Sequence, residues 1–320
     1  SVLNATISLY AHATLRPRDD RKVTIRSLDL KDTIEASDLE TFLACSDKFD
    51  LFRGLLQLIK PNFGFDLYVR CDFPQGSGLG GSSAVLAAIL GCFNEFRSDK
   101  WNEYELAELA FQSERIILDI SGGWQDQYAT IFGGINFIEF KNGDNLIHPL
   151  RLAEKTILNL EESLVLYELN TGRNSGAIHD DQKKVMQSQE IKKKVEINVK
   201  HCLEMRESLL RGNLDTFGKG LNIAWELKRQ FSSKISSTVI DEIYDYAIEN
   251  GALGGKLLGA GGGGFFLFYI KDFEKNHFME AMRKKGLIET RFKFDLAGIR
   301  SWKKRDELKL ISKGENSENW

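Results

Sequence analysis

The sequence contains little proline, little cysteine and no long apolar stretch. Four prolines and four cysteines occur in 320 residues. The longest apolar stretches, Ala84–Cys92 and Phe265–Ile270, fall far short of the roughly 20 residues that a membrane-spanning helix needs, and no secretory signal is visible. The cysteines are widely spaced without a C-x-x-C pair, which argues against a zinc or redox motif and favours reduced thiols in the cytoplasm.

An excess of charge of one sign is also lacking. The 43 Lys and Arg residues are balanced by 46 Asp and Glu residues, for a net charge of −3. Because a nucleic-acid binder normally carries a basic stripe, we expect no nucleic-acid partner, and equally no membrane partner. A hydrophobic fraction of 42% excludes dominant disorder. The length favours two domains, which we predict at 1–155 and 156–320.

The 28 glycines are clustered, and the first cluster follows a predicted strand over Phe65–Cys71 and precedes a predicted helix over Ala84–Phe96. Glycines let backbone N–H groups approach an anion closely, and the start of a helix adds partial positive charge. Two adjacent serine hydroxyls at the helix start suit a phosphate oxygen or a Mg²⁺ ion. The sequence therefore predicts a phosphate-binding loop made of Pro74, Gly76, Ser77, Gly78, Leu79, Gly80, Gly81, Ser82 and Ser83.

The pattern of this loop allows three other interpretations. Gly76-x-Gly78-x-x-Gly81 matches the dinucleotide fingerprint, but that motif needs a second strand ending in an acid. Asn102–Leu118 is instead predicted as a helix, since Asn102 and Glu105 form a capping-box pattern. A Walker loop would need Lys after Gly81, where Ser82 stands. A tight turn of several positive-φ glycines remains the simplest alternative.

Periodicity predicts further elements along the chain. We expect strands over Val2–Leu15, Lys22–Leu28, Gly134–Phe140, Ser163–Leu169, Phe265–Ile270 and Arg291–Phe294. We expect helices over Ser46–Ile59, over long charged runs between 175 and 250 with a break near Gly212, and over Asp272–Lys285.

Two motifs resemble those of the GHMP kinases, a family that includes galactokinase, homoserine kinase and mevalonate kinase. Pro74-x-x-x-Gly78-Leu79-Gly80-Gly81-Ser82-Ser83-Ala84 resembles the ATP-binding motif of the family, and Lys256-x-x-Gly259-Ala260-Gly261-Gly262-Gly263-Gly264 resembles its C-terminal glycine motif. The resemblance covers nearly the whole chain. It implies an α+β fold with an N-terminal α/β domain like ribosomal S5 domain 2 and a C-terminal ferredoxin-like domain. It also implies ATP and Mg²⁺ as cofactors.

Within the family, Val2–Ile7, Ser121–Ala129 and Thr171–Ser175 most resemble the D-glycero-D-manno-heptose 7-phosphate kinases. That subgroup phosphorylates the anomeric hydroxyl of the sugar phosphate and gives the 1,7-bisphosphate. The alternatives are a galactokinase- or fucokinase-like enzyme that uses an unphosphorylated sugar, and a catalytically silent sensor of sugar and ATP. The oligomeric state stays open. The resemblance also implies sugar contacts from a segment preceding Val2.

The resemblance implies roles for single residues. It places Ser83 and Glu114 on Mg²⁺ and Asp126 at the sugar hydroxyl, and its substrate contacts are Gly123, Thr171, Gly172, Arg173, Gly261 and Gly262.

The residues alone leave other roles open. Glu114 could pair with Arg115 or another base, Asp126 could cap a helix, and Arg173 could be an ordinary surface arginine. Trp225 is predicted to be a core residue, and Lys228 on the same helix could reach the substrate.

Overall fold

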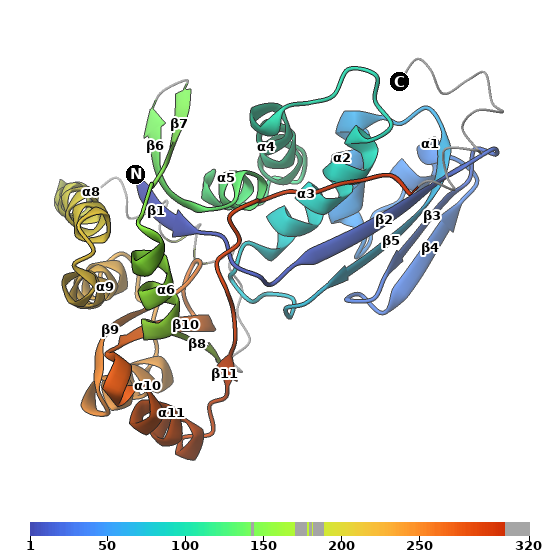
Figure 1. The fold of residues 1–320 in the computed structure, drawn as a ribbon. Coiled ribbons are helices and arrows are strands. Elements are labelled where there is room, and N and C mark those ends of the chain that lie inside the picture. Colours follow the sequence, from blue (N-terminus) through green and yellow to red (C-terminus); the bar gives the residue numbers. More distant parts are fainter. Residues whose placement is uncertain (142–143, 170–177, 179–180, 182–188, 305–320) are drawn as a thin grey trace. The chain divides into compact units, whose positions relative to one another are not determined.

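The computed structural model describes residues 1–141, 144–169, 178, 181 and 189–304 (Figure 1). By their contacts the residues divide into two compact units, each built from several segments. Unit 1 consists of Ser1–Ser8, Gly76–Leu79 and Gly134–Asp295, and unit 2 consists of Leu9–Gln75, Gly80–Gly133 and the chain from Leu296 onward. The predicted boundary after residue 155 stays a prediction.

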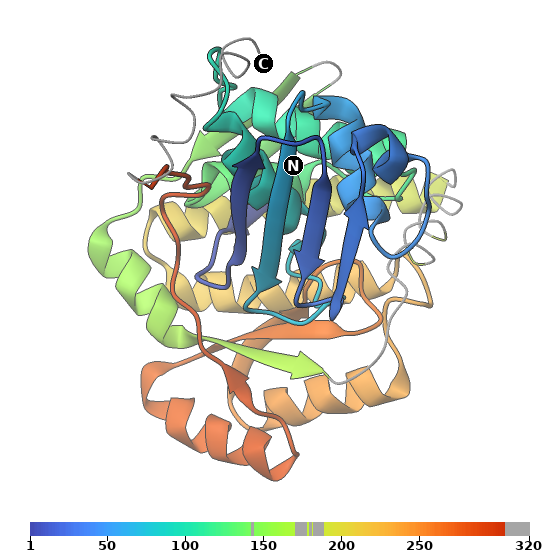
Figure 2. The same cartoon turned by 90° about the vertical axis from the view of Figure 1, so that its right-hand side faces the viewer.

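Unit 2 contains a four-stranded sheet with strand order β2-β5-β3-β4, in which β3 and β5 are parallel and the other pairs antiparallel. Figure 2 shows these strands side by side, with helices of the unit behind them. The elements are β2 (Ala11–Arg18), β3 (Val23–Ser27), β4 (Asp32–Ala36), α1 (Leu39–Leu43), α2 (Asp50–Ile59), β5 (Gly64–Cys71), α3 (Gly81–Asn94), α4 (Glu103–Phe111), a π-helix (Gln112–Ile117) and α5 (Gln125–Phe132).

The core of unit 2 lies between this sheet and α3. Phe65, Leu67 and Val69 alternate along β5 with exposed Tyr68 and Arg70, so one face of the strand is buried and the other is not. The ring of Phe65 meets that of Phe93 on α3 edge to face, with centroids 5.1 Å apart. This packing fixes the helix whose first turn ends the glycine-rich loop.

Unit 1 contains two antiparallel sheets, with strand orders β1-β6-β7 and β11-β8-β10-β9. Its elements are β1 (Val2–Ala5), β6 (Ile135–Lys141), β7 (Asp144–Pro149), α6 (Glu154–Ser163), β8 (Leu164–Leu169), α8 (Gln189–Leu210), α9 (Leu214–Arg229), α10 (Thr238–Glu249), β9 (Ala252–Leu257), β10 (Gly264–Ile270), a 3₁₀ turn (Asp272–Glu274), α11 (Lys275–Lys284) and β11 (Glu289–Thr290). Numbered by appearance, the second sheet has the order 4-1-3-2 with every pair antiparallel, which is the expected ferredoxin-like arrangement.

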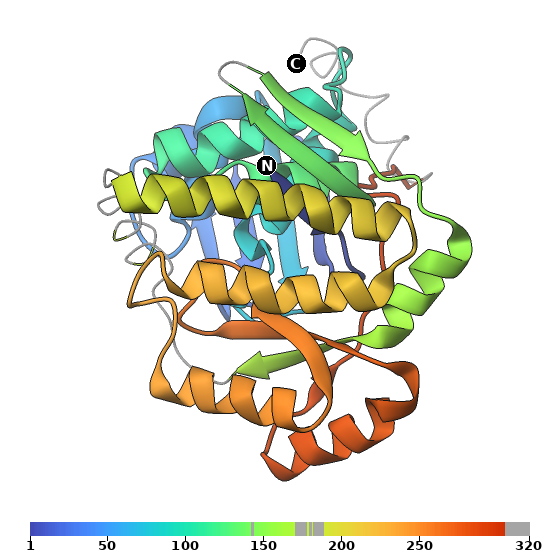
Figure 3. The same ribbon diagram turned by 90° about the vertical axis from the view of Figure 1, so that its left-hand side faces the viewer.

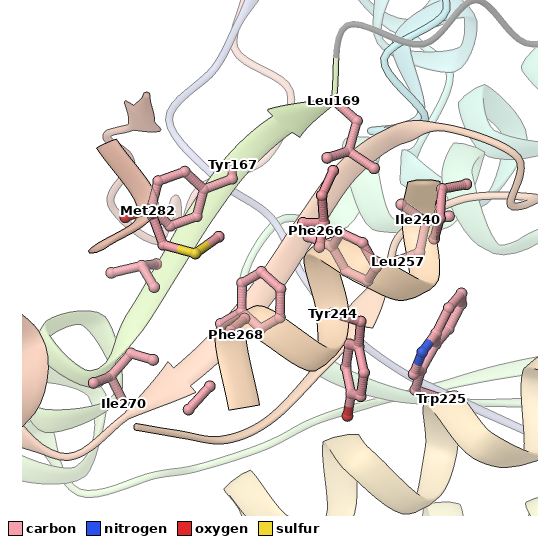
Figure 4. Packing of buried hydrophobic residues seen from close by; sticks show 14 of the residues in the cluster. Tyr167, Leu169, Trp225, Ile240, Tyr244, Leu257, Phe266, Phe268, Ile270 and Met282 are labelled. Atoms are coloured by element: carbon pink, nitrogen blue, oxygen red, sulfur yellow. The ribbon is translucent and has the colours of Figure 1, made fainter. Parts of the chain in front are cut away.

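Two hydrophobic clusters hold unit 1 together. In Figure 4 one cluster gathers Tyr244, Phe266, Phe268 and fully buried Trp225, whose ring lies edge to face with that of Phe266 at 5.5 Å. The prediction that Trp225 is a core residue is confirmed. The other cluster joins β6 to the side-by-side helices α8 and α9 seen in Figure 3.

The structure differs from several expectations. The stretch Val2–Leu15 forms two strands, β1 and β2, which belong to different units. The last strand is Glu289–Thr290, and Phe294 makes only an isolated bridge to Ile7. None of the cysteines, all four of which lie in the described ranges, forms a disulfide bond, which agrees with the expectation of reduced thiols. Among the described residues, no helix combines the length and the apolar character that crossing a membrane would require.

Candidate active site

The glycine-rich loop leads from β5 into α3, as predicted. Gly76, Gly78 and Gly80 have φ angles of +78°, +78° and +73°, which residues with side chains rarely adopt. At Gly81 a Cβ atom would lie 2.7 Å from the ring of Phe73. Gly80 is the N-cap of α3 and, as a glycine, has no side chain with which to cap the first turn. The first-turn N–H groups of α3 are therefore left to other acceptors, as anion binding requires.

Glu114 lies at the centre of a buried polar cluster in unit 2. Its side chain is fully buried on the π-helix Gln112–Ile117. The carboxylate accepts hydrogen bonds from the hydroxyl of Ser82, from the hydroxyl of Ser83 at 2.7 Å and from the side-chain amide of Gln127. The site thus links α3, the π-helix and α5.

The alternative that Glu114 forms a salt bridge is wrong. None of the ion pairs formed within the described parts of the chain involves Glu114. Arg115 instead donates to the backbone carbonyls of Ile120 and Gly123, at 3.2 and 3.4 Å. A buried carboxylate whose partners in the described part of the chain are all neutral donors is costly and fits an incoming cation.

The donor set around Glu114 suits a magnesium ion. A carboxylate and a hydroxyl are hard oxygen ligands, and Mg²⁺ binds proteins through one or two such groups while phosphates and water complete its shell. Among the residues that the structure describes, no group of three or more His, Cys, Asp or Glu side chains could hold a metal on its own. Ser83 and Glu114 therefore fit a metal that arrives with a nucleotide.

Asp126 lies half-buried on the first turn of α5, beside the loop. A Cβ atom at Gly80 would be 3.2 Å from the Cβ of Asp126, so the loop backbone passes close to the Asp126 side chain. The helix begins at Gln125, and its N-cap is Trp124. The alternative that Asp126 is the N-cap residue is therefore wrong.

The segment before α5 is held by Arg115 and by an aromatic stack. A Cβ atom at Gly122 would lie 2.5 Å from the guanidinium carbon of Arg115, so a side chain at this position would displace the guanidinium. The ring of Trp124 stacks on that of Phe111, with centroids 3.3 Å apart. Gly123 is exposed, and a Cβ atom there would meet nothing within 4 Å. A packing reason is therefore visible for Gly122 and not for Gly123.

The second glycine motif forms the turn between β9 and β10 in unit 1. Gly261 and Gly262 have φ angles of +116° and +71°. A Cβ atom at Gly261 would lie 2.9 Å from the Cα of Ile235, and one at Gly262 would lie 2.8 Å from the side chain of Ile178. The N–H of Gly262 donates to the carbonyl of Ile235 at 2.8 Å. Packing alone thus requires glycine here, and the substrate contact expected for both residues stays a prediction.

Lys228 and Lys256 lie close to this turn. The ammonium of Lys228 on α9 donates to the carbonyls of Leu257 and Gly259, at 2.8 and 2.6 Å. Lys228 therefore binds the backbone of the glycine turn. On β9, burial lowers the pKa of the Lys256 ammonium below its ordinary value.

Some predicted contacts lie outside what the structure describes. Thr171, Gly172 and Arg173 belong to the range 170–177, which is not described.

The sequence did not predict Gln127 as a partner of Glu114, and the one available signal was its position next to Asp126.

A glycine-rich loop at a helix start, beside a buried hydroxyl–carboxylate pair and a second acid, defines a phosphoryl-transfer protein. Comparison with known proteins gives the family. Residues 48–134 match the model of the GHMP kinases N terminal domain, and residues 205–287 match the GHMP kinases C terminal model. The chain belongs to the GHMP kinase family.

Individual relatives agree with this assignment. Over 308 residues the chain is 37% identical to a D-glycero-alpha-D-manno-heptose 7-phosphate kinase from Campylobacter jejuni, covering 94% of this chain and 91% of the relative. A solved D-glycero-D-manno-heptose 1-phosphate kinase from Bacteroides thetaiotaomicron superposes with a TM-score of 0.76 at 27% identity, covering 95% and 90% of the two chains. A Lactococcus lactis galactokinase in complex with galactose shares the fold, with a TM-score of 0.73 at 20% identity over 94% and 88% of the chains.

Proposed function

We propose that the protein is an ATP- and Mg²⁺-dependent sugar kinase. It transfers the γ-phosphoryl group to the anomeric hydroxyl of D-glycero-D-manno-heptose 7-phosphate and gives the 1,7-bisphosphate. The observation that carries the proposal is the buried Ser83–Glu114 pair at the start of α3, with Asp126 packed against Gly80. The 37% identity to a heptose 7-phosphate kinase supports the choice of sugar.

The loop and the polar cluster have separate tasks in this proposal. The loop residues Gly76–Ser83 bind the phosphates of ATP through backbone N–H groups and the positive end of α3, and Pro74 begins the loop without an N–H group of its own. Ser83 and Glu114 hold Mg²⁺, which when bound offsets the negative charge that develops on the transferring phosphoryl group.

Asp126 serves as the acceptor of the sugar proton. Phosphoryl transfer needs positioning and a group that orients the attacking hydroxyl, and a carboxylate does both. Gly123, Gly261 and Gly262, together with Thr171–Arg173, form the substrate contacts of the proposal. A guanidinium fork suits a sugar phosphate because it donates two parallel hydrogen bonds. Widely spaced cysteines without a C-x-x-C pair, together with an ATP-dependent reaction, support the proposal of a cytoplasmic location.

A substrate panel tests the proposal. ADP release is followed with D-glycero-D-manno-heptose 7-phosphate, the unphosphorylated heptose, galactose and fucose, each with Mg²⁺ or with a chelator. We expect the phosphorylated heptose to give the highest kcat/KM, to need Mg²⁺, and to yield an anomeric phosphate by ³¹P NMR. Preference for an unphosphorylated sugar would favour the galactokinase- or fucokinase-like alternative. Nucleotide and sugar binding without turnover would favour the silent sensor.

A further inference from the structure

Gln127 is a fully buried polar residue to which the proposed function gives no task. It follows Asp126 on the first turn of α5, and its side-chain amide donates to the same Glu114 oxygen, Oε2, that accepts the hydroxyl of Ser83. We infer that Gln127 is a positioning residue that orients the carboxylate of Glu114 for the metal and ties it to the turn that carries Asp126. This inference rests on the proposed function, since it deepens the role of the Glu114 site.

The chemistry of the contact fixes which way the amide points. Oε2 of Glu114 is an acceptor, so only the NH₂ end of the Gln127 amide can face it without repulsion. The other end, Oε1, is then a buried acceptor with no hydrogen-bond partner among the described residues. A buried acceptor without a partner destabilises the folded state. A methionine of similar shape would avoid that cost, so Gln127 is poorly explained as a stabilising residue.

The hydrogen bonds at Glu114 divide its two oxygens. Ser82 donates to Oε1, whereas Ser83 and Gln127 both donate to Oε2. Ser83 would be a metal ligand in the proposed function, whereas Gln127 would not, so the amide of Gln127 would serve only to hold Oε2 of the carboxylate in place. Groups that hold a ligand in this way change metal affinity by about 10–100-fold when they are removed.

The hydrogen bond between Gln127 and Glu114 also restrains the position of Asp126, because Asp126 and Gln127 are neighbours in the backbone. Asp126 and Gln127 are consecutive residues of one helical turn, and Gly80 packs against the Asp126 side chain. Fixing Gln127 on Glu114 therefore fixes where α5 begins relative to the start of α3. Loss of the amide donor is expected to disturb Glu114 directly and Asp126 only indirectly, through the backbone of α5.

Gln127→Met tests the inference, with Ser113→Ala as the matched control. Ser113 adjoins Glu114 on the π-helix, and like Gln127 it has a buried side-chain oxygen without a partner among the described residues. Unlike Gln127, it donates no hydrogen bond to Glu114 within that part of the chain. For each protein the affinity of a non-hydrolysable ATP analogue is measured by calorimetry with and without Mg²⁺, and the ratio of the two affinities gives the gain from the metal. Thermal unfolding is measured without nucleotide.

We expect Gln127→Met to reduce the gain from Mg²⁺ by about tenfold or more, with metal-free affinity within twofold of wild type. Ser113→Ala should keep the full gain. An unchanged gain in Gln127→Met, or an equal loss of affinity with and without metal, would overturn the inference. If Gln127→Met fails to fold, Gln127→Asn keeps the amide one CH₂ shorter and should show the same loss of gain.

The proposed function fails in a different way. If wild-type protein binds the ATP analogue with the same affinity with and without Mg²⁺, both the metal part of the proposed function and this inference are overturned. Wild-type protein with a full gain from Mg²⁺ but no turnover of any sugar phosphate would overturn the proposed function alone, since the effect of Gln127→Met on metal binding could still be measured.

Discussion

At the scale of single residues, the loop Gly76–Ser83 could be predicted because it is one contiguous motif between a strand and a helix. The roles expected for Glu114 and Asp126 came from family resemblance, since the residues alone left other roles open. The contacts of Gln127 with Glu114 and of Lys228 with Gly259 could not be predicted in this way. The first contact joins residues 13 positions apart and the second joins residues 31 positions apart. No periodicity of the sequence predicts contacts of this kind.

Asp126→Asn tests the proposed acceptor carboxylate. The change keeps the shape of the side chain and removes its negative charge, so the sugar hydroxyl loses the group that takes its proton. General-base contributions are typically about 10²–10⁴-fold, and we expect kcat to fall by that factor. ATP affinity should persist, because the proposed phosphate contacts lie in the loop. Steady-state kinetics and calorimetry measure the two quantities, and a variant with near wild-type kcat would remove Asp126 from the mechanism.

Arg173→Met tests the proposed contact with the sugar phosphate, which rests on resemblance alone. A hydrogen bond to a charged group contributes about 1.5–3 kcal/mol, so KM for heptose 7-phosphate should rise roughly tenfold or more. KM for ATP should stay the same, as should KM for any unphosphorylated sugar that the enzyme accepts. An unchanged KM for the sugar phosphate would show that Arg173 lies elsewhere.

At the scale of elements, the start of α4 could be predicted, whereas the change of helix type that follows it could not. The capping box of Asn102 and Glu105 begins α4 as expected, because both of its hydrogen bonds are local. The π-helix that follows over Gln112–Ile117 was missed, since its sequence has ordinary helical periodicity. It is a widened turn that buries Glu114 opposite Ser83, and such turns often occur at functional sites.

Gly261→Ala tests the glycine turn between β9 and β10. The φ angle of +116° would strain any side chain, and the new Cβ atom would lie 2.9 Å from the backbone of Ile235. Backbone strain of this kind costs about 1–3 kcal/mol and overpacking adds a comparable amount, so urea unfolding should show a loss of about 2 kcal/mol or more.

Gly123→Ala is the control for this prediction. Its Cβ atom would meet nothing within 4 Å, and surface changes of this kind stay within about 0.5 kcal/mol. If Gly123 contacts substrate, Gly123→Ala should lower activity without lowering stability. Wild-type stability in Gly261→Ala would mean that the turn relaxes and that packing does not require glycine there.

At the scale of the whole molecule, the path of the chain is the feature that sequence patterns describe least. The strand order β11-β8-β10-β9 came from family resemblance, because alternation of apolar residues marks a strand and says nothing about its neighbours. Likewise, Ser1–Ser8 and Gly134–Asp295 share unit 1 although 125 residues separate them. Contacts this distant in sequence leave no local signal.

The predicted boundary after residue 155 can be tested with two fragments, 134–295 and 156–295. The shorter one lacks Ile135, Leu150 and Leu152, whose side chains pack with Leu160 and Phe217 in one cluster of unit 1. Burying such a side chain contributes about 1.5–3 kcal/mol, so 156–295 should unfold at lower urea and bind more of the dye ANS than 134–295. Both fragments lack Ser1–Ser8, so that loss cancels in the comparison. If 156–295 unfolds cooperatively at the same urea concentration as 134–295, residue 155 is a folding boundary, and β6 and β7 add nothing to the core of unit 1.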